Sequence, residues 1–247
     1  MRNIWTIARR EYDLYFINPI AYIVFFTIML VLGIVFALNV LNASQSGLYG
    51  GYVPDSSMIT NPMVFMFVLS APAITMRLLA EEQRMGTMEL LLTAPVRDVE
   101  LVLGKWLGAF LFILTLVIMT LVFPLMLNQF TIPGIDWKFM ISGYLGVLLV
   151  VSAFLGIGVG ISSMFSNQIA AFFTTLIVLV ILWWLIGAPA SLLGQGGELF
   201  RYLSMQTHYY DTMARGRIFL EDIIYYLSLT SLGIFVGTIS VELRRWR

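Results

Sequence analysis

The most regular feature of the sequence is a series of long apolar stretches separated by short polar segments. Residues 14–54, 106–135 and 139–197 contain no Asp, Glu, Lys, Arg or His. A helix needs about 20 apolar residues to cross a bilayer core that is roughly 30 Å thick. The pattern therefore predicts an all-α integral membrane protein with six transmembrane helices. These helices are expected at residues 19–40, 62–76, 106–127, 140–165, 169–186 and 223–241.

Burial in a soluble core is the alternative explanation for these stretches, and the composition argues against it. Hydrophobic residues make up 60% of the chain and charged residues 11%, whereas a soluble domain carries about 25% charged residues. The chain therefore lacks a polar shell that could cover six such helices. The second stretch is short for a membrane span, but residues 78–80 extend its apolar pattern.

The basic residues predict how the chain is oriented in the membrane. Lys and Arg gather on the cytoplasmic side of membrane proteins. With the N-terminus inside, ten of the 14 basic residues lie inside as well, so both termini are expected in the cytoplasm. The inner side holds Arg2, Arg9, Arg10, Arg77, Arg84, Arg97, Lys105, Arg244, Arg245 and Arg247, and the outer side holds Lys138, Arg201, Arg215 and Arg217.

The N-terminal segment, residues 1–17, shows the periodicity of an amphipathic helix. This predicts a helix that lies in the cytoplasmic membrane interface. A simple juxtamembrane anchor of Trp, Tyr and Arg side chains explains the same pattern equally well. The segment lacks the apolar core and cleavage site of a signal peptide, so we expect it to be retained. One face comprises Thr6, Arg9, Arg10 and Asp13, and another comprises Trp5, Ala8, Tyr12 and Tyr15.

Several functions are disfavoured by the residues that the chain lacks. It has no cysteine, which excludes thiolate zinc sites and cysteine nucleophiles, and its net charge of zero gives no electrostatic basis for binding nucleic acid. The single histidine, His208, cannot form a zinc site alone, and a structural or interfacial role is favoured for it. The acidic residues lie in loops or at the ends of the predicted spans, which disfavours an intramembrane enzyme or a proton-coupled carrier.

A nucleotide-binding loop is also absent from the sequence. Gly104 and Lys105 resemble the end of a phosphate-binding loop, which requires an earlier glycine and a following Ser or Thr. Val99 and Trp106 occupy those two positions. The chain is therefore not expected to bind ATP, to carry a cofactor or metal, or to contain a catalytic site.

The connection between the second and third predicted helices, residues 77–105, is the most informative polar segment. Residues 77–85 can continue the second helix into the cytoplasm. The segment then carries a series of helix start and stop signals. These are Gly86 as a helix stop, Thr87 as the N-cap of a short helix at 88–92, Pro95 as its end and Asp98 as the cap of the third span.

The short helix at 88–92 is unusual for a solvated segment because its three leucines would face water. Exposed apolar side chains rimmed by charges suggest a knob that enters a groove on a soluble partner. Packing of the leucines against the N-terminal helix is an alternative, and both arrangements can hold. The leucines are Leu90, Leu91 and Leu92, and the rim comprises Glu81, Glu82, Arg84 and Glu89.

Two longer segments are expected on the outer side. Residues 41–61 are polar and Gly-rich, which is typical of a loop. Residues 189–222 mix apolar and polar positions, which favours short helices that re-enter the outer leaflet. Irregular backbone at membrane depth requires cover by protein or water, so this segment is a candidate lining for a pathway.

Pairs of glycines four residues apart predict close contacts between helices. Gly104 and Gly108 form one pair, and Gly156 and Gly160 form another. This spacing lets helices approach closely, either within the chain or across a dimer. Packing within the chain is favoured over a dimer seam because such pairs are common in membrane helices.

Four segments carry a resemblance to a known family. AEEQRMGTMELLLTAPVRDVELVLGKWLGAF, residues 80–110, resembles the cytoplasmic signature of ABC-2 type permeases, the membrane subunits of ATP-binding-cassette exporters. SNQIAAF at 166–172 and ARGRIFLEDIIYYLSL at 214–229, with the terminal ELRRWR, resemble the gliding-motility-associated permease subgroup. The resemblance extends over nearly the whole chain. No internal repeat or low-complexity tract divides the sequence, so a single membrane domain, residues 1–247, is expected.

The resemblance also implies an architecture and a set of partners. It implies six transmembrane helices, an N-terminal interfacial helix, a cytoplasmic coupling helix between spans two and three, and short re-entrant helices before span six. Two permease chains would carry two ATPase subunits, which would hold ATP and Mg, in a bacterial inner membrane. The residues that couple the permease to the ATPase would be Glu82, Gly86, Thr87, Glu89, Leu90, Leu91 and Leu92, and a second, smaller cytoplasmic contact would comprise Ser166, Asn167 and Gln168.

The function that the resemblance implies is export of an unidentified substrate, driven by ATP hydrolysis in the partner. A non-transporting membrane scaffold, which passes the same motion to an extracytoplasmic partner, is the alternative. Contact with membrane lipid is expected in both cases, and an accessory extracytoplasmic subunit remains open.

Overall fold

The computed structural model describes residues 2–46, 55, 57–87, 96–130, 134–192 and 197–245, and this part of the chain is entirely helical apart from turns and short connections. The helices are α1 (Arg2–Ile17), α2 (Pro19–Ser46), α3 (Ser57–Thr75), α4 (Ala80–Met85), α6 (Asp98–Thr120), α7 (Val122–Phe130), α8 (Trp137–Ser162), α9 (Gln168–Val180), the π-helical turn η2 (Ile181–Leu185), α10 (Ala188–Leu192), α11 (Glu198–Leu203), α12 (Met205–Tyr210), the 3-10 turn η4 (Met213–Arg215) and α13 (Leu220–Arg245).

Six helical stretches within the described residues are long and apolar enough to span a membrane, which confirms the number predicted. They are Ala21–Ser44, Ser57–Met85, Asp98–Phe130, Trp137–Ser162, Gln168–Ala190 and Leu220–Arg244. The third is longer than predicted because a single turn joins α6 to α7.

The prediction of a loop over 41–61 is wrong at both ends. Helix α2 continues to Ser46 and α3 already begins at Ser57. Small polar side chains make these ends compatible with helix because they hydrogen-bond locally: the Ser44 hydroxyl donates to the Leu41 carbonyl at 2.8 Å. Before α3, the Ser57 N–H donates to Asp55 Oδ1 at 2.9 Å, which satisfies a free group at the helix start.

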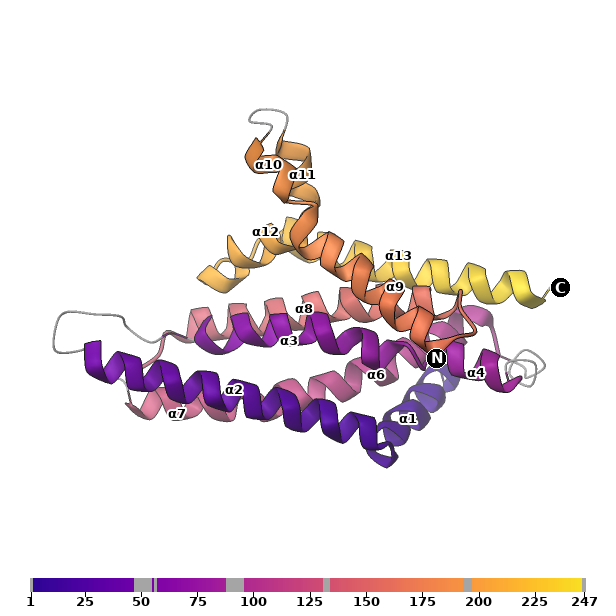
Figure 1. Ribbon diagram of the computed structural model, residues 1–247, viewed down its shortest axis with the longest axis horizontal. Helices are drawn as coiled ribbons and strands as arrows, with labels where there is room; N and C mark the ends of the chain where they lie inside the picture. Colours follow the sequence, from indigo (N-terminus) through magenta and orange to yellow (C-terminus); the bar gives the residue numbers. More distant parts are fainter. Residues whose placement is uncertain are drawn as a thin grey trace.

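Helix α8 lies at the centre of the bundle. In Figure 1 it lies between α13 above and α3 below, and α6 and α2 lie beyond α3. Gly156 and Gly160 face α13, because a Cβ added to Gly156 would lie 2.9 Å from Thr230 Cα and one added to Gly160 would lie 2.6 Å from the Gly233 carbonyl oxygen. The prediction that these glycines pack within the chain is therefore confirmed.

The outer helices of the bundle present apolar faces to their surroundings. Helix α2 exposes Ile23 and Phe26, α9 exposes Phe173, and α13 exposes Phe235. Such faces suit contact with lipid acyl chains rather than water. Helices α10 and α11 project away from the bundle in Figure 1.

The segment predicted at 189–222 contains short helices, as expected. Tyr209 and Met213 pack on Gly146 of α8, and the Ser142 hydroxyl donates to the Met213 carbonyl at 2.7 Å. Gly146 lies nine residues into α8, which is about 13 Å along the helix axis. The segment therefore folds back along α8 before α13 begins.

Candidate functional site

Helix α4 is held against the end of α8 by a cluster of hydrogen bonds. The turn between α3 and α4 breaks the helical pattern and leaves backbone N–H groups without intrahelical partners. Ser162 fills this gap, because its Oγ lies 3.2 Å from the Leu79 N–H and 3.1 Å from the Ala80 N–H. The Gln83 side-chain amide also donates to the Ser163 carbonyl at 2.7 Å. Helix α4 is thus fixed to α8 by two neighbouring serines.

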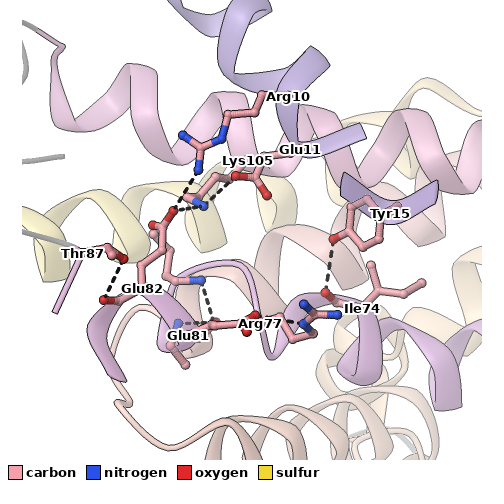
Figure 2. Close-up of polar contacts among 12 residues, drawn as sticks. Arg10, Glu11, Tyr15, Ile74, Arg77, Glu81, Glu82, Thr87 and Lys105 are labelled. Carbon is pink, nitrogen blue, oxygen red and sulfur yellow. Dashed lines mark hydrogen bonds and ion pairs between the residues drawn. The ribbon is translucent and has the colours of Figure 1, made fainter. Parts of the chain in front are cut away.

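A buried group of charged side chains joins α4 to α1 and α6. Lys105 Nζ lies 2.8 Å from Glu82 Oε1 and 2.9 Å from Glu11 Oε1. The Lys105 side chain is only 3% exposed and both carboxylates are 10% exposed. Arg10 lies on the solvent side, 4.0 Å from Glu82 (Figure 2). We call Glu11, Glu82 and Lys105 the charge cluster.

Close packing of α1 on α6 brings Glu11 within reach of Lys105. Gly104 and Gly108 face α1, because a Cβ added to Gly104 would lie 2.7 Å from Ile7 Cβ and one added to Gly108 would lie 2.6 Å from Glu11 Cβ. This glycine pair therefore also packs within the chain, as predicted. Any larger residue at position 108 would push Glu11 away.

Two tyrosines fix the rest of α1. The Tyr12 hydroxyl lies 3.0 Å from Thr115 Oγ1 of α6, and the Tyr15 hydroxyl donates to the Ile74 carbonyl of α3 at 3.2 Å. Burial raises the pKa of the Tyr15 phenol well above its usual range, so that it remains a neutral donor. Helix α1 is therefore packed against the bundle rather than separate from it.

The predicted ATPase-contact residues are only partly described. Glu82 belongs to the charge cluster, and Gly86 ends α4 in the left-handed conformation with φ of 71°, as predicted for a helix stop. The Thr87 hydroxyl donates to the Glu82 carbonyl at 3.3 Å. The predicted helix at 88–92, with Glu89, Leu90, Leu91 and Leu92, lies outside the described residues, as does Pro95.

The helix-start prediction for the third span is wrong by one residue. Asp98 is the first residue of α6 rather than its cap. Arg97 takes the cap position because its backbone N–H donates to Glu100 Oε2 at 3.2 Å. The carboxylate three residues into the helix therefore sets the boundary.

The predicted second contact lies where α8 passes into α9: Ser166 and Asn167 are in the turn, and Gln168 is the first residue of α9. Asn167 caps α9, since its Oδ1 accepts from the Ile169 N–H at 2.9 Å, and Ser166 and Asn167 are exposed. The Gln83 bond to Ser163 places this turn at the same end of the bundle as α4. The described residues of the first set, Glu82, Gly86 and Thr87, thus lie at the same end of the protein as this turn.

Sequence reasoning missed two pairings. Glu11 and Lys105 were not predicted to meet Glu82, although a lone lysine at the start of an apolar span is a signal that it needs a partner. His208 was given a structural role without partners. It is buried, with Nδ1 2.7 Å from Asp222 Oδ1, Nε2 2.8 Å from the Tyr202 carbonyl, and its ring stacked on Tyr225. It joins α11 to α13.

These features define a polytopic helical membrane protein with a buried charge cluster near one end of α8. Within the described residues, no group of three or more His, Asp or Glu side chains could hold a metal ion. Residues 14–242 match the family model described as ABC-2 family transporter protein, so the chain belongs to this family. It is a membrane subunit without a catalytic domain, and permeases of this family function with an ATPase subunit. A search of curated proteins found no match.

Proposed function

We propose that this chain is the permease subunit of a bacterial ABC exporter, located in the inner membrane with both termini in the cytoplasm. Two permease chains would assemble with two ATPase subunits, which bind ATP and Mg. The observation that carries the proposal is the position of α4. It directly precedes the predicted coupling helix and is bound to three other helices through the charge cluster and Ser162.

The proposed mechanism transmits motion as a rigid body. Binding of ATP to the ATPase pair displaces the segment at 88–92, and Gly86 and Thr87 connect this segment to α4. Lys105 passes the displacement to α6, Glu11 passes it to α1, and Ser162 passes it to α8. Packed helices respond to such a push by discrete shifts, and the favoured state is set by differential binding.

The finer assignments belong to the same proposal. We assign the chain to the gliding-motility-associated subgroup and treat residues 1–247 as one membrane domain. Within it, residues 1–17 form the interfacial helix, 77–105 the cytoplasmic coupling segment and 189–222 the re-entrant segment. The residues that couple the permease to the ATPase are Glu82, Gly86, Thr87, Glu89, Leu90, Leu91 and Leu92, with a second, smaller contact at Ser166, Asn167 and Gln168.

One observation favours the scaffold function as a second candidate. Helix α11 has no buried residue, and its Leu199 and Tyr202 are 66% and 55% exposed. Figure 1 shows α10 and α11 extending beyond the bundle. An exposed apolar helix that projects in this way suits contact with an extracytoplasmic subunit. The exporter remains preferred because the coupling mechanism requires no such subunit.

Site-specific cross-linking tests the proposed ATPase contact. A photoreactive amino acid at Leu91 should form an adduct with a protein that carries a phosphate-binding loop, identified by mass spectrometry from host membranes. The same amino acid at Leu41, near the far end of α2 and 57% exposed, is the control and should give no such adduct. Absence of an ATPase adduct at Leu91 in an expressed, folded variant would overturn the coupling assignment.

Reconstitution separates the exporter from the scaffold. The complex of permease and ATPase in proteoliposomes should show ATPase activity that rises with a transported lipid, peptide or drug. If no panel of candidate substrates stimulates the activity, while an extracytoplasmic protein that binds α10 and α11 does, the scaffold function is favoured instead.

A further inference from the structure

The charge cluster forms one wall of an open cavity of about 660 Å³. Helix α1 contributes Arg10, Leu14 and Ile17 to its lining, and the turn before α4 contributes Arg77. In Figure 2, Glu82 and Lys105 lie toward one side of the group, and Tyr15 and Arg77 lie toward the other. The cavity therefore has an acidic inner wall, two arginines and an apolar rim.

The formal charge of the inner wall is negative. Glu11 and Glu82 share the single ammonium of Lys105, so the three buried side chains together carry a charge of minus one. The nearest further cation is Arg10, which is 61% exposed and 4.0 Å from Glu82. Glu82 Oε2 is buried and has no hydrogen-bond partner among the described residues. A buried carboxylate oxygen without a donor favours a ligand that brings positively charged N–H groups.

The outer part of the cavity favours a ligand that also carries an anionic group close to its positively charged N–H groups. Arg10 makes one long ion pair, and Arg77 uses its Nε for Glu81 at 2.9 Å. A guanidinium has five N–H donors, so both arginines keep donors in a geometry that suits phosphate. The rim is apolar, because Leu14, Ile17 and Met85 are 44%, 76% and 61% exposed.

The apolar rim continues into a face that suits acyl chains. Pro19, the first residue of α2, also lines the cavity. Beyond it, α2 exposes Tyr22, Ile23 and Phe26 along the first membrane span. A ligand with an ammonium, an adjacent phosphate and two acyl chains therefore matches the cavity: the ammonium suits the acidic wall, the phosphate suits the arginines, and the acyl chains suit the apolar rim and α2.

We propose that this cavity binds the headgroup of a phospholipid that carries a primary ammonium beside its phosphate, as in phosphatidylethanolamine. The ammonium donates to Glu82, the phosphate accepts from Arg10 and Arg77, and the acyl chains lie along α2. Phosphatidylcholine lacks N–H donors, and phosphatidylglycerol lacks the positive charge. This binding needs only the permease chain. It can therefore fail while the coupling proposal holds, and the coupling proposal can fail while the lipid still binds.

Native mass spectrometry of the purified permease tests the proposal with lipids that share the same two acyl chains. Phosphatidylethanolamine should bind about tenfold more tightly than phosphatidylcholine or phosphatidylglycerol, the difference expected for one charge-assisted hydrogen bond. Glu82→Gln should remove this preference, because Glu82 accepts from the ammonium. Arg10→Gln should weaken the binding of all three lipids, because each of them carries the phosphate. Arg9→Gln is the matched control, because Arg9 is exposed on α1 and does not line the cavity.

The outcomes separate the possible occupants. Equal binding of the three lipids, or lipid binding that Arg10→Gln leaves as tight as in the wild type, would overturn the proposal. Arg10 is largely exposed, so this variant should fold even if Glu82→Gln does not. Soluble glycerophosphoethanolamine should compete only weakly. If it binds as tightly as the lipid, the site belongs to a soluble phosphoamine and the lipid assignment is wrong.

Discussion

Replacing Lys105 with methionine removes the one ammonium that lies between two buried carboxylates. Glu11 and Glu82 would then face each other with side chains that are only 10% exposed. Removal of one partner from a buried ion pair destabilises a protein by about 3 to 5 kcal/mol, because a buried charge is left uncompensated. For a chain of this size, that loss corresponds to a decrease in melting temperature on the order of 10 °C.

Thermal melts of the purified permease in detergent measure this decrease. Arg9→Met is the control, since it removes an exposed basic side chain from the same region and should leave the melting temperature unchanged. A triple variant with Lys105→Met, Glu11→Gln and Glu82→Gln should recover most of the lost stability, because no charge then remains in the cluster. A melting temperature of Lys105→Met equal to that of the wild type would refute the buried cluster.

Three further predictions concern other parts of the chain. Arg84→Cys should react with an impermeant thiol reagent only after cells are opened, and labelling in intact cells would contradict the proposed cytoplasmic location of Arg84. Gly160→Val should destabilise the permease by about 1 to 3 kcal/mol, since its Cβ would lie 2.6 Å from the Gly233 carbonyl oxygen, whereas Gly33→Val, with nothing closer than 3.9 Å, should melt like the wild type. His208→Phe should cost about 3 kcal/mol because it leaves Asp222 buried without its partner, and an unchanged melt would show that the pair contributes no stability.

The membrane spans could be predicted from the sequence because their signal is local. An apolar stretch needs only its own residues to reveal a helix that suits lipid. The helix ends were less predictable. Residues 41–46 are mostly polar yet helical, and a polar side chain such as Ser44 is accommodated there because its hydroxyl bonds to a carbonyl in the preceding turn. Local polarity therefore predicted a loop where the backbone remains helical.

The charge cluster could not be predicted, because its members are distant in sequence. Glu11 and Lys105 are 94 residues apart, and helical periodicity describes the faces of each helix without saying which faces meet. The glycine spacing in α6 did indicate a close approach. It did not identify α1 as the neighbour, which depends on the shape of Ile7 and Glu11 as much as on Gly104 and Gly108.

The charge cluster places an ionic contact where helices α1, α4 and α6 meet. A buried ion pair adds little net stability compared with apolar residues of similar volume, so stability alone gives no reason for it. A lysine between two carboxylates can adjust its position in a way that a single ion pair cannot. When its contact with one carboxylate lengthens, the other carboxylate still neutralises its charge. Under the proposed mechanism, Lys105 can therefore pass a displacement of α4 to α6 and α1 while its two contacts adjust and it stays paired, whereas a well-packed apolar contact would resist such adjustment. The cluster suits a joint that moves, which supports placing the coupling function at α4.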